Sequence, residues 1–458
     1  MILGAAIAVV AGAAAIVFVH PLLPIVVLLG AAAGLVVLRD IDLAFLGVVA
    51  IVLLLPFAAI PLGVGFNPTF LDLALGAVYL IWIVRLATRE QPRVHWPPLS
   101  AGVLVLIGLA FVALLAGMAQ GVPSKNQLRV FAELVLGGGL FFVVANLIED
   151  RASLRRVFLA LVGLGTVAAA IGLGLYLLPD GLQIDLLSML RVVDYPSGPA
   201  VLRYLNDDPS RLQRATGTSV DPNSFGGMLA VVAALVLPQL VSRAPLVGRR
   251  AAGLMLAILV AALLATVSRG SLLGFGVAVG LIGLVRDRRL LVGLLAAGLG
   301  LFAVARLVPW TAAYLDHFAQ GLAGEDRATQ MRFGEYRDAL RLIGRYPAFG
   351  VGFGDVRDVD LYRGVSSLYL IIAETMGLVG LGAFLAVVGA FGARVAFAWR
   401  RMPPDGLRAV VLGCLAALVA ALVGGVFDHY FFTYPHAFAL LWLVLGLGMR
   451  AVQLEAEG

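Results

Sequence analysis

The sequence predicts an all-α fold, a polytopic helical membrane protein with about 12–14 transmembrane helices and two long segments on its outer face. Of its 458 residues, 61% are hydrophobic and only 13% are charged, whereas about 25% are charged in an ordinary soluble domain. Apolar runs of spanning length follow one another along the chain. The composition excludes a soluble globular enzyme, because too little polar surface remains to cover a core of this size.

A helix needs about 20 largely apolar residues to cross a bilayer. Candidate spans that approach this length are 2–19, 21–38, 43–61, 68–84, 98–118, 130–147, 154–178, 222–241, 251–268, 270–285, 289–307, 366–393, 409–426 and 435–450. We therefore expect five regions: an N-terminal transmembrane bundle (1–178), a first outer segment (179–221), core transmembrane helices (222–307), a large outer loop containing a helix (308–365), and C-terminal transmembrane helices (366–458).

The distribution of arginines predicts the orientation. With both termini in the cytoplasm, most arginines of the short loops fall on the cytoplasmic side, and the short outer loops hold only Lys125, Arg129 and Arg269. Because cytoplasmic loops carry the excess of basic residues, we expect the segments 179–221 and 308–365 to lie on the outer face. The net charge of +6 then reflects loop charge, and we expect no nucleic-acid partner.

Several chemistries are excluded by residue counts. Cys414 is the single cysteine, so neither an intramolecular disulfide nor a cysteine metal cage can form. Lys125 is the single lysine and follows no glycine-rich phosphate loop, and the five histidines form no HExxH pair. We expect no cofactor and no metal site.

Ionisable groups at membrane depth are candidates for function, because burying an unpaired charge is costly. Arg129 and Glu133 lie four residues apart and are expected to form a structural pair. Asp72 is expected to cap or pair near the interface. Arg269 is a different case, because it separates two apolar runs and is flanked by Ser268 and glycine, which would leave room for a ligand beside a fixed cation.

A polar stretch runs from Arg214 into the span that starts at 222. Asp221 is expected to be the N-cap of that helix, with Pro222 at its first position and Asn223 next. A helix N-terminus beside an arginine is a suitable anion site. We therefore expect Arg214 and Arg269 to share one pocket at the outer face.

The large outer loop has a helical pattern over 327–347. Arg337, Arg341 and Arg345 recur on one face, which is typical of a solvated surface, whereas Arg332 lies off this stripe. We expect the 308–365 segment to cover the pocket, with Arg332 lining it. A later outer turn, 427–436, is rich in aromatic residues and contains Asp428 and His429.

The order of these motifs resembles the bacterial O-antigen ligase and O-antigen polymerase superfamily, which are GT-C-type transferases of polyprenyl-diphosphate-linked glycans. The resemblance covers about 214–382 and rests on six elements: Arg214, Asp221-Pro222-Asn223, Thr266-x-Ser268-Arg269-Gly270, Arg332…Tyr336, Tyr346-Pro347…Gly350-Val351-Gly352, and Glu374-x-x-Gly377. It implies a metal-independent, inverting transferase whose partners are a polyprenyl-diphosphate-linked glycan donor, a glycan or lipid-linked acceptor, the lipid bilayer and a chain-length regulator protein.

One departure separates the two branches of the superfamily. Ligases carry His-Asn before the Glu-x-x-Gly helix, where this sequence has Ser366-Ser367. The resemblance therefore favours a polymerase of the bacterial inner membrane over a ligase that transfers glycan to lipid A core. A flippase of lipid-linked sugars is a further alternative, which predicts internal repeats and charges at mid-membrane.

Under this hypothesis Arg214, Arg269 and Arg332 bind the donor diphosphate, and Asp221, Asn223, Ser268 and Asp428 support the site. The candidates for the base that accepts the hydroxyl proton are then His429, Glu374, Asp221 and Asp428. His429 ranks slightly first, because the pKa of a histidine lies near 6.5 in the absence of perturbation. Asp221 is expected to be occupied as a helix cap.

Overall fold

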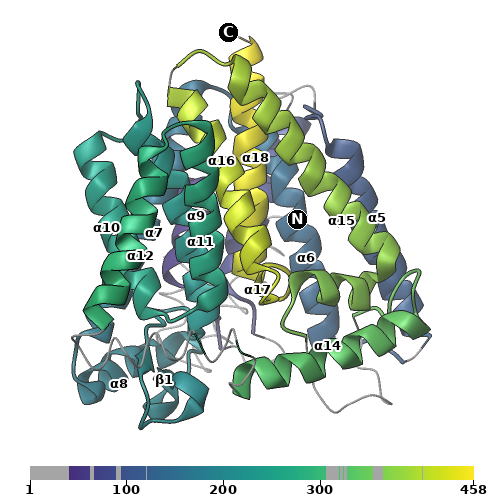
Figure 1. Ribbon diagram of the computed structural model, residues 1–458. Helices are drawn as coiled ribbons and strands as arrows, with labels where there is room; N and C mark the ends of the chain where they lie inside the picture. Colours follow the sequence, from purple (N-terminus) through teal and green to yellow (C-terminus); the bar gives the residue numbers. More distant parts are fainter. Residues whose placement is uncertain are drawn as a thin grey trace, which may run out of the picture.

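The computed structural model describes residues 41–61, 67–88, 94–119, 121–305, 327–353, 365–404 and 406–457, together with positions 319 and 323. Its main body is a bundle of long helices that run roughly parallel (Figure 1). They are α3 (Ile41–Leu54), α4 (Phe70–Ala87), α5 (Ser100–Met118), α6 (Lys125–Leu147), α7 (Arg151–Tyr176), α9 (Pro222–Val241), α10 (Arg249–Ala265), α11 (Arg269–Val285), α12 (Arg289–Ala305), α15 (Leu368–Arg401), α16 (Gly406–Gly424) and α18 (Pro435–Glu457).

The predicted all-α, polytopic membrane fold is confirmed. Within the described residues, eight helices are long and apolar enough to cross a bilayer, and α3, α11 and α12 are apolar but shorter. Each predicted span from 43–61 onward overlaps one of the long helices of the bundle, with 251–268 corresponding to α10, while 2–19 and 21–38 lie outside the described residues. The expected structural pair is present as well, since Arg129 Nε lies 2.9 Å from Glu133 Oε1.

Two buried helices form the centre of the bundle. Nearly every side chain of α9 is buried, and α9 packs against α16, α10, α11 and α7. The side chains of α18 are buried from His436 to Ala451, and α18 packs against α6 and α16. A helix that is apolar on all faces has no side suited to water. Their packing against several neighbours, rather than their apolar composition alone, places α9 and α18 at the centre.

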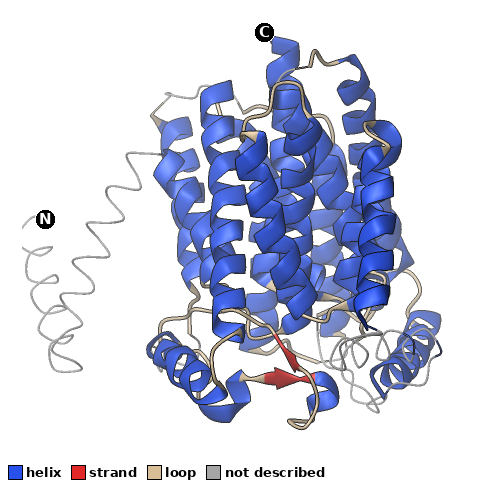
Figure 2. Cartoon of the chain, turned by 60° about the vertical axis from the view of Figure 1, so that its left-hand side comes forward, coloured by secondary structure: helices blue, strands red, loops and turns tan. Residues whose placement is uncertain are grey.

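The irregular segments gather at one end of the bundle, opposite the C-terminus (Figures 1 and 2). They comprise α8 (Asp180–Ser188), 3₁₀ turns at Met189–Val193, Gly198–Val201 and Leu205–Asp207, the strands β1 (Arg203–Tyr204) and β2 (Gln213–Arg214), α14 (Arg327–Arg345) and α17 (Tyr430–Thr433). The strands are antiparallel, with Arg203 opposite Arg214. The segments 179–221 and 327–345 thus lie at the same end of the bundle, which agrees with the expectation that both lie on the outer face.

Helix α15 is interrupted at Gly377, and the loop after α14 fills the break. The N–H groups of Val351 and Gly352 donate to the carbonyls of Glu374 and Thr375 at 2.8 and 3.0 Å, and Leu378 N–H donates to Pro347 O at 2.8 Å. Gly377 has φ 71° and ψ −179°, a conformation open essentially to glycine alone. The Tyr346-to-Gly352 and Glu-x-x-Gly motifs are therefore two halves of one structural unit.

We predict that Gly377→Ala destabilises the protein by about 2–4 kcal/mol, because the new Cβ would need a left-handed backbone and would overlap the Ala348 carbonyl group. Gly382→Ala, in the same helix, meets no atom within 4 Å and is the matched control. Thermal unfolding in detergent should show a lower midpoint for Gly377→Ala alone. Equal midpoints for the two variants would contradict this role of the break.

Candidate active site

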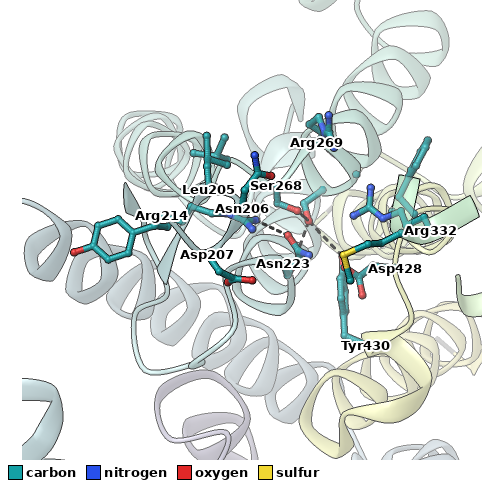
Figure 3. A pocket seen from close by; sticks show the side chains of 17 residues that line it. Leu205, Asn206, Asp207, Arg214, Asn223, Ser268, Arg269, Arg332, Asp428 and Tyr430 are labelled. Atoms are coloured by element: carbon teal, nitrogen blue, oxygen red, sulfur yellow. Dashed lines mark hydrogen bonds between the residues drawn. The ribbon is translucent and has the colours of Figure 1, made fainter. Parts of the chain in front are cut away.

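A pocket of about 210 Å³ opens among the irregular segments. Its walls come from the β1–β2 hairpin, the N-termini of α9 and α11, helix α14, and the turn between α16 and α17. Figure 3 shows Arg214, Arg269 and Arg332 entering from three different elements, with Asp428 and Tyr430 along one side. Segments more than 200 residues apart in the chain, from Tyr204 to Tyr430, therefore form one polar hollow.

The N-terminus of α11 forms one wall. Val267 has a positive φ of 52°, which is strained for a β-branched residue, and this turns the chain so that α11 begins at Arg269. Ser268, Gly270 and Ser271 all line the pocket. The first N–H groups of a helix have no acceptor within it, and the helix dipole favours an anion near them. The small side chains leave this helix end accessible.

The N-terminus of α9 adjoins that of α11. Val220, like Val267 before α11, has a positive φ, here 58°. Asp221 is the predicted N-cap, and its Oδ1 accepts the Ser224 N–H at 2.7 Å. A Cβ at Gly226 would lie 2.9 Å from Thr266 Oγ1 and 3.0 Å from Ser271 Oγ. Glycine at this position therefore allows the two helix ends to approach each other closely.

Arg214 joins these two helix ends to the hairpin. Its Nε donates to Thr266 O at 2.8 Å, and its Nη2 donates to Asn223 Oδ1. Beside it, the Ala215 N–H donates to Ala265 O at 2.9 Å. The guanidinium is thus held in place by the segments that lead into α9 and α11.

The electrostatic environment of Arg214 is mixed. Burial lowers the pKa of Arg214 to about 10, the carboxylates of Asp221 and Asp428 raise it, and the positive charges of Arg332 and Arg269 lower it. A guanidinium with this pKa remains charged at neutral pH. Burial also raises the pKa of Asp221, and the nearby charge of Asp428 raises it further. The pocket is therefore a field of fixed charges of both signs.

Helix α14 brings Arg332 to the pocket and is held in position by two contacts. Glu335 Oε2 accepts the Ser366 N–H at 2.8 Å. The Tyr336 hydroxyl lies 3.0 Å from Ser366 O and 3.2 Å from Val426 O. Within the described part of the chain, the Arg332 guanidinium has no hydrogen-bond or ion-pair partner, so its donors remain available to a ligand.

The turn between α16 and α17 completes the pocket. Asp428 Oδ1 accepts the His429 N–H at 2.8 Å, and Oδ2 has no hydrogen-bond partner among the described residues. The buried Tyr430 hydroxyl lies 3.3 Å from Ser271 Oγ. The Tyr430 ring packs over Gly227, where any larger residue would overlap it.

Comparison with known proteins finds one family model that matches part of the chain. A family model described as O-Antigen ligase matches residues 254–385, the region that contains Arg269, Arg332 and the broken α15. This match supports the resemblance of the chain to the O-antigen ligase and O-antigen polymerase superfamily. No curated protein matches it. A solved structure titled "Structural coordination of polymerization and crosslinking by a peptidoglycan synthase complex" is similar at 19% identity, covering 77% of this chain and 96% of that one, with a TM-score of 0.40.

The structure brings together most of the candidate site residues that the sequence predicts. Arg214, Arg269 and Arg332 all line the pocket, as do Asn223, Ser268 and Asp428. Arg269 also contacts α14, since its Nη2 lies 3.5 Å from Thr329 Oγ1. The expected convergence of Arg214 with Arg269, and the approach of the outer loop through Arg332, are therefore present as geometry.

Other candidates lie outside this pocket. The His429 Nδ1 lies 2.6 Å from Thr433 Oγ1, one turn along α17. Glu374 lies on α15 under the loop that fills the helix break, and its backbone carbonyl accepts the Val351 N–H. Asp221 is a helix cap, and Asp72 likewise forms a capping box with Thr69. Neither His429 nor Glu374 is among the pocket-lining residues.

Sequence reasoning did not single out Tyr204, Asn206, Asp207 and Tyr430, although all four line the pocket. Asn206 and Asp207 adopt positive φ values of 57° and 58°, which asparagine and aspartate tolerate better than most residues. The polar run Asn206-Asp207-Asp208-Pro209 was an available turn signal. No sequence signal indicates that Tyr430 points into the pocket, because a tyrosine that lies at the membrane interface would occur in the same aromatic-rich turn.

We predict that Asp221→Asn keeps the stability of the protein, whereas Asp221→Ala lowers it by about 1 kcal/mol. Asparagine retains the oxygen that accepts the Ser224 N–H and removes a buried carboxylate whose pKa is already raised. Thermal unfolding of both variants in detergent provides the measurement. Equal losses of stability for Asp221→Asn and Asp221→Ala would show that the negative charge, rather than the cap, matters.

Proposed function

We propose that this protein is a glycan polymerase that transfers polyprenyl-diphosphate-linked oligosaccharide repeat units onto a sugar hydroxyl at the outer face of the membrane. The observation that carries the proposal is the convergence of Arg214, Arg269 and Arg332 on one pocket at one end of a membrane-spanning bundle. Resemblance to the O-antigen ligase and polymerase superfamily supports the same substrate class.

The three arginines suit a diphosphate leaving group. As the glycosidic bond to the lipid diphosphate breaks, negative charge develops on the phosphate oxygens. Guanidinium groups bind such oxygens through paired N–H donors, and removal of one preorganised donor typically costs about 3–4 kcal/mol of transition-state stabilisation. The N-terminus of α11 adds a partial positive charge at the same place. In this proposal the arginines supply the charge stabilisation, so the reaction requires no metal.

The reaction is a single displacement that inverts the anomeric carbon. The acceptor oxygen forms a bond to that carbon, the bond to the diphosphate oxygen breaks, and the lipid diphosphate leaves with the bonding electron pair. The hydroxyl proton passes to a base. We assign this role to Asp428, because its carboxylate lines the pocket and Oδ2 is not held by another described residue. His429 and Glu374, which the sequence ranks first, remain the alternatives.

The segment Ser366-Ser367 supports a polymerase over a ligase. The backbone of Ser366 is engaged by Glu335 and Tyr336, and the side chain there is a hydroxyl where ligases carry a histidine base. The ligase alternative, transfer of the glycan to lipid A core, is favoured by the description of the matching family model. The positive-inside rule supports an orientation with the pocket on the outer face of the membrane. In this proposal the membrane is the bacterial inner membrane, and a chain-length regulator protein would act beside the pocket.

The decisive experiment incubates the purified protein with lipid-linked repeat units and separates the products by size. We expect a ladder of polymers for the wild-type protein. Transfer to an added lipid A core, without a ladder, would indicate the ligase. Arg332→Gln should reduce turnover by two to three orders of magnitude, since about 3–4 kcal/mol of donor interaction is lost.

The matched control is Arg337→Gln, which removes the same charge from the exposed face of the same helix. It should keep activity within about twofold of the wild-type rate, because surface charges contribute little. If both substitutions reduce turnover alike, the general positive charge of α14 matters rather than a specific contact of Arg332. If neither does, Arg332 is not a donor ligand.

The assignment of the base predicts an order of activities among three variants. Asp428→Asn should lower turnover by about 10²–10⁴-fold, the usual contribution of a positioned base. His429→Ala and Glu374→Gln should retain most of the activity, because neither side chain lines the pocket. The assay compares all three at equal expression. If Asp428→Asn keeps full turnover and His429→Ala loses it, the base is His429 and not Asp428.

A further inference from the structure

One wall of the active-site pocket is a tight turn in the loop between β1 and β2. The Asp208 N–H donates to Leu205 O at 3.2 Å, and the two residues between them, Asn206 and Asp207, have φ values of 57° and 58°. These features match a type I′ β-turn, in which both central residues adopt a left-handed backbone. The Leu205 side chain is buried with that of Val267, which holds the turn beside the N-terminus of α11.

Asp207 occupies a position of this turn that favours glycine. Asparagine followed by glycine is the preferred central pair of a type I′ turn, and a left-handed backbone is strained for an aspartate but not for glycine. Strain of this kind is retained where another requirement outweighs it. Within the part of the chain that the structure describes, the Asp207 side chain forms no hydrogen bond or ion pair that would compensate for the strain. A ligand therefore explains this carboxylate better than the turn does.

The neighbouring Asp208 shows what a purely structural role in the same loop requires. Its Oδ1 accepts the Ser210 N–H at 2.9 Å and the Ser210 hydroxyl at 2.7 Å, and its Oδ2 lies 3.5 Å from Arg211 Nε. Asp208 does not line the pocket, whereas Asn206 and Asp207 do. The loop thus uses one carboxylate to hold its shape and directs the other to the pocket.

The chemistry of Asn206 and Asp207 suits sugar hydroxyls rather than phosphate. Figure 3 shows both residues on one side of the pocket, with Arg332 and Asp428 on the opposite side. A carboxylate repels a diphosphate but accepts hydrogen bonds from hydroxyl groups, and an amide both donates and accepts, as a hydroxyl does. Neighbouring hydroxyls of one sugar ring present such a mixed set of donors and acceptors.

We propose that Asn206 and Asp207 bind ring hydroxyls of the sugar that is attached directly to the donor diphosphate. The inference rests on the proposed function, in which the arginines hold that diphosphate and Asp428 receives the proton of the acceptor. Because the acceptor hydroxyl must approach from the side of Asp428, the wall formed by the turn is left to the donor sugar. Both side chains then contribute to binding and to the choice of donor, and neither transfers a proton.

The test compares two ligands, the lipid-linked repeat unit of the transfer assay and undecaprenyl diphosphate, which lacks the sugar. Binding of each to the full-length protein is measured in detergent. Asn206→Gly/Asp207→Gly should bind the repeat unit at least about tenfold more weakly than the wild-type protein, since two hydrogen bonds are lost and one of them is to a charged group. Its affinity for undecaprenyl diphosphate should stay within about twofold. Asp208→Asn, the matched control, should bind both ligands as the wild-type protein does.

Wild-type affinity of the double-glycine variant for the repeat unit, or equal losses for the two ligands, would overturn the inference. Arg332→Gln tests the proposed function separately, because it should weaken both ligands alike. Unchanged binding of both would contradict the diphosphate site and leave the sugar contacts to be judged from the double-glycine variant.

Thermal unfolding separates a sugar-binding role of the two side chains from a structural one. The double-glycine variant should keep the wild-type midpoint, because relief of the left-handed backbone offsets the greater freedom of glycine in the unfolded chain. A clearly lower midpoint would assign Asn206 and Asp207 to the structure of the loop and would also overturn the inference.

Discussion

The polar pocket depends on the hydrogen bonds of Arg214. Its guanidinium donates to Thr266 O, before α11, and to Asn223, in the first turn of α9. Because a buried cation needs acceptors around it, the hairpin that carries Arg214 is held against both helix ends. The left-handed turns at Val220 and Val267 direct these ends toward it. The remaining donors of the pocket, on Arg269 and Arg332, are arranged around this fixed charge.

The irregular backbone at this end of the bundle also needs hydrogen-bond partners within the protein. In lipid every backbone polar group must find a partner within the protein, so the break in α15 at Gly377 is filled by the loop that follows α14. That loop also packs on α5, where a Cβ at Gly117 would lie 2.8 Å from Val351 O. The glycines of these motifs therefore support α14, which in turn presents Arg332. Their contribution to the site is structural and indirect.

The two ends of the bundle use arginine differently. At the pocket end, arginines from β2, α11 and α14 line a hollow together with Asp428, and Asp221 lies close enough to raise the pKa of Arg214. At the opposite end, Arg243, Arg286 and Arg408 line a second, smaller hollow. The first arrangement suits a reaction in which charge moves and a proton is transferred.

The sequence by itself determined the membrane fold, its long helices, the N-cap at Asp221, the capping role of Asp72, and the three arginines of the pocket. Each follows from local information, since apolar run length, capping residues and isolated charges act within a few neighbouring residues. Tertiary structure alone decided which carboxylate meets the arginines. Asp428 and His429 are adjacent, yet only Asp428 lines the pocket, while His429 turns toward Thr433. The direction of each side chain depends on how the turn after α16 packs against α9, α11 and α14, which are far away in the sequence.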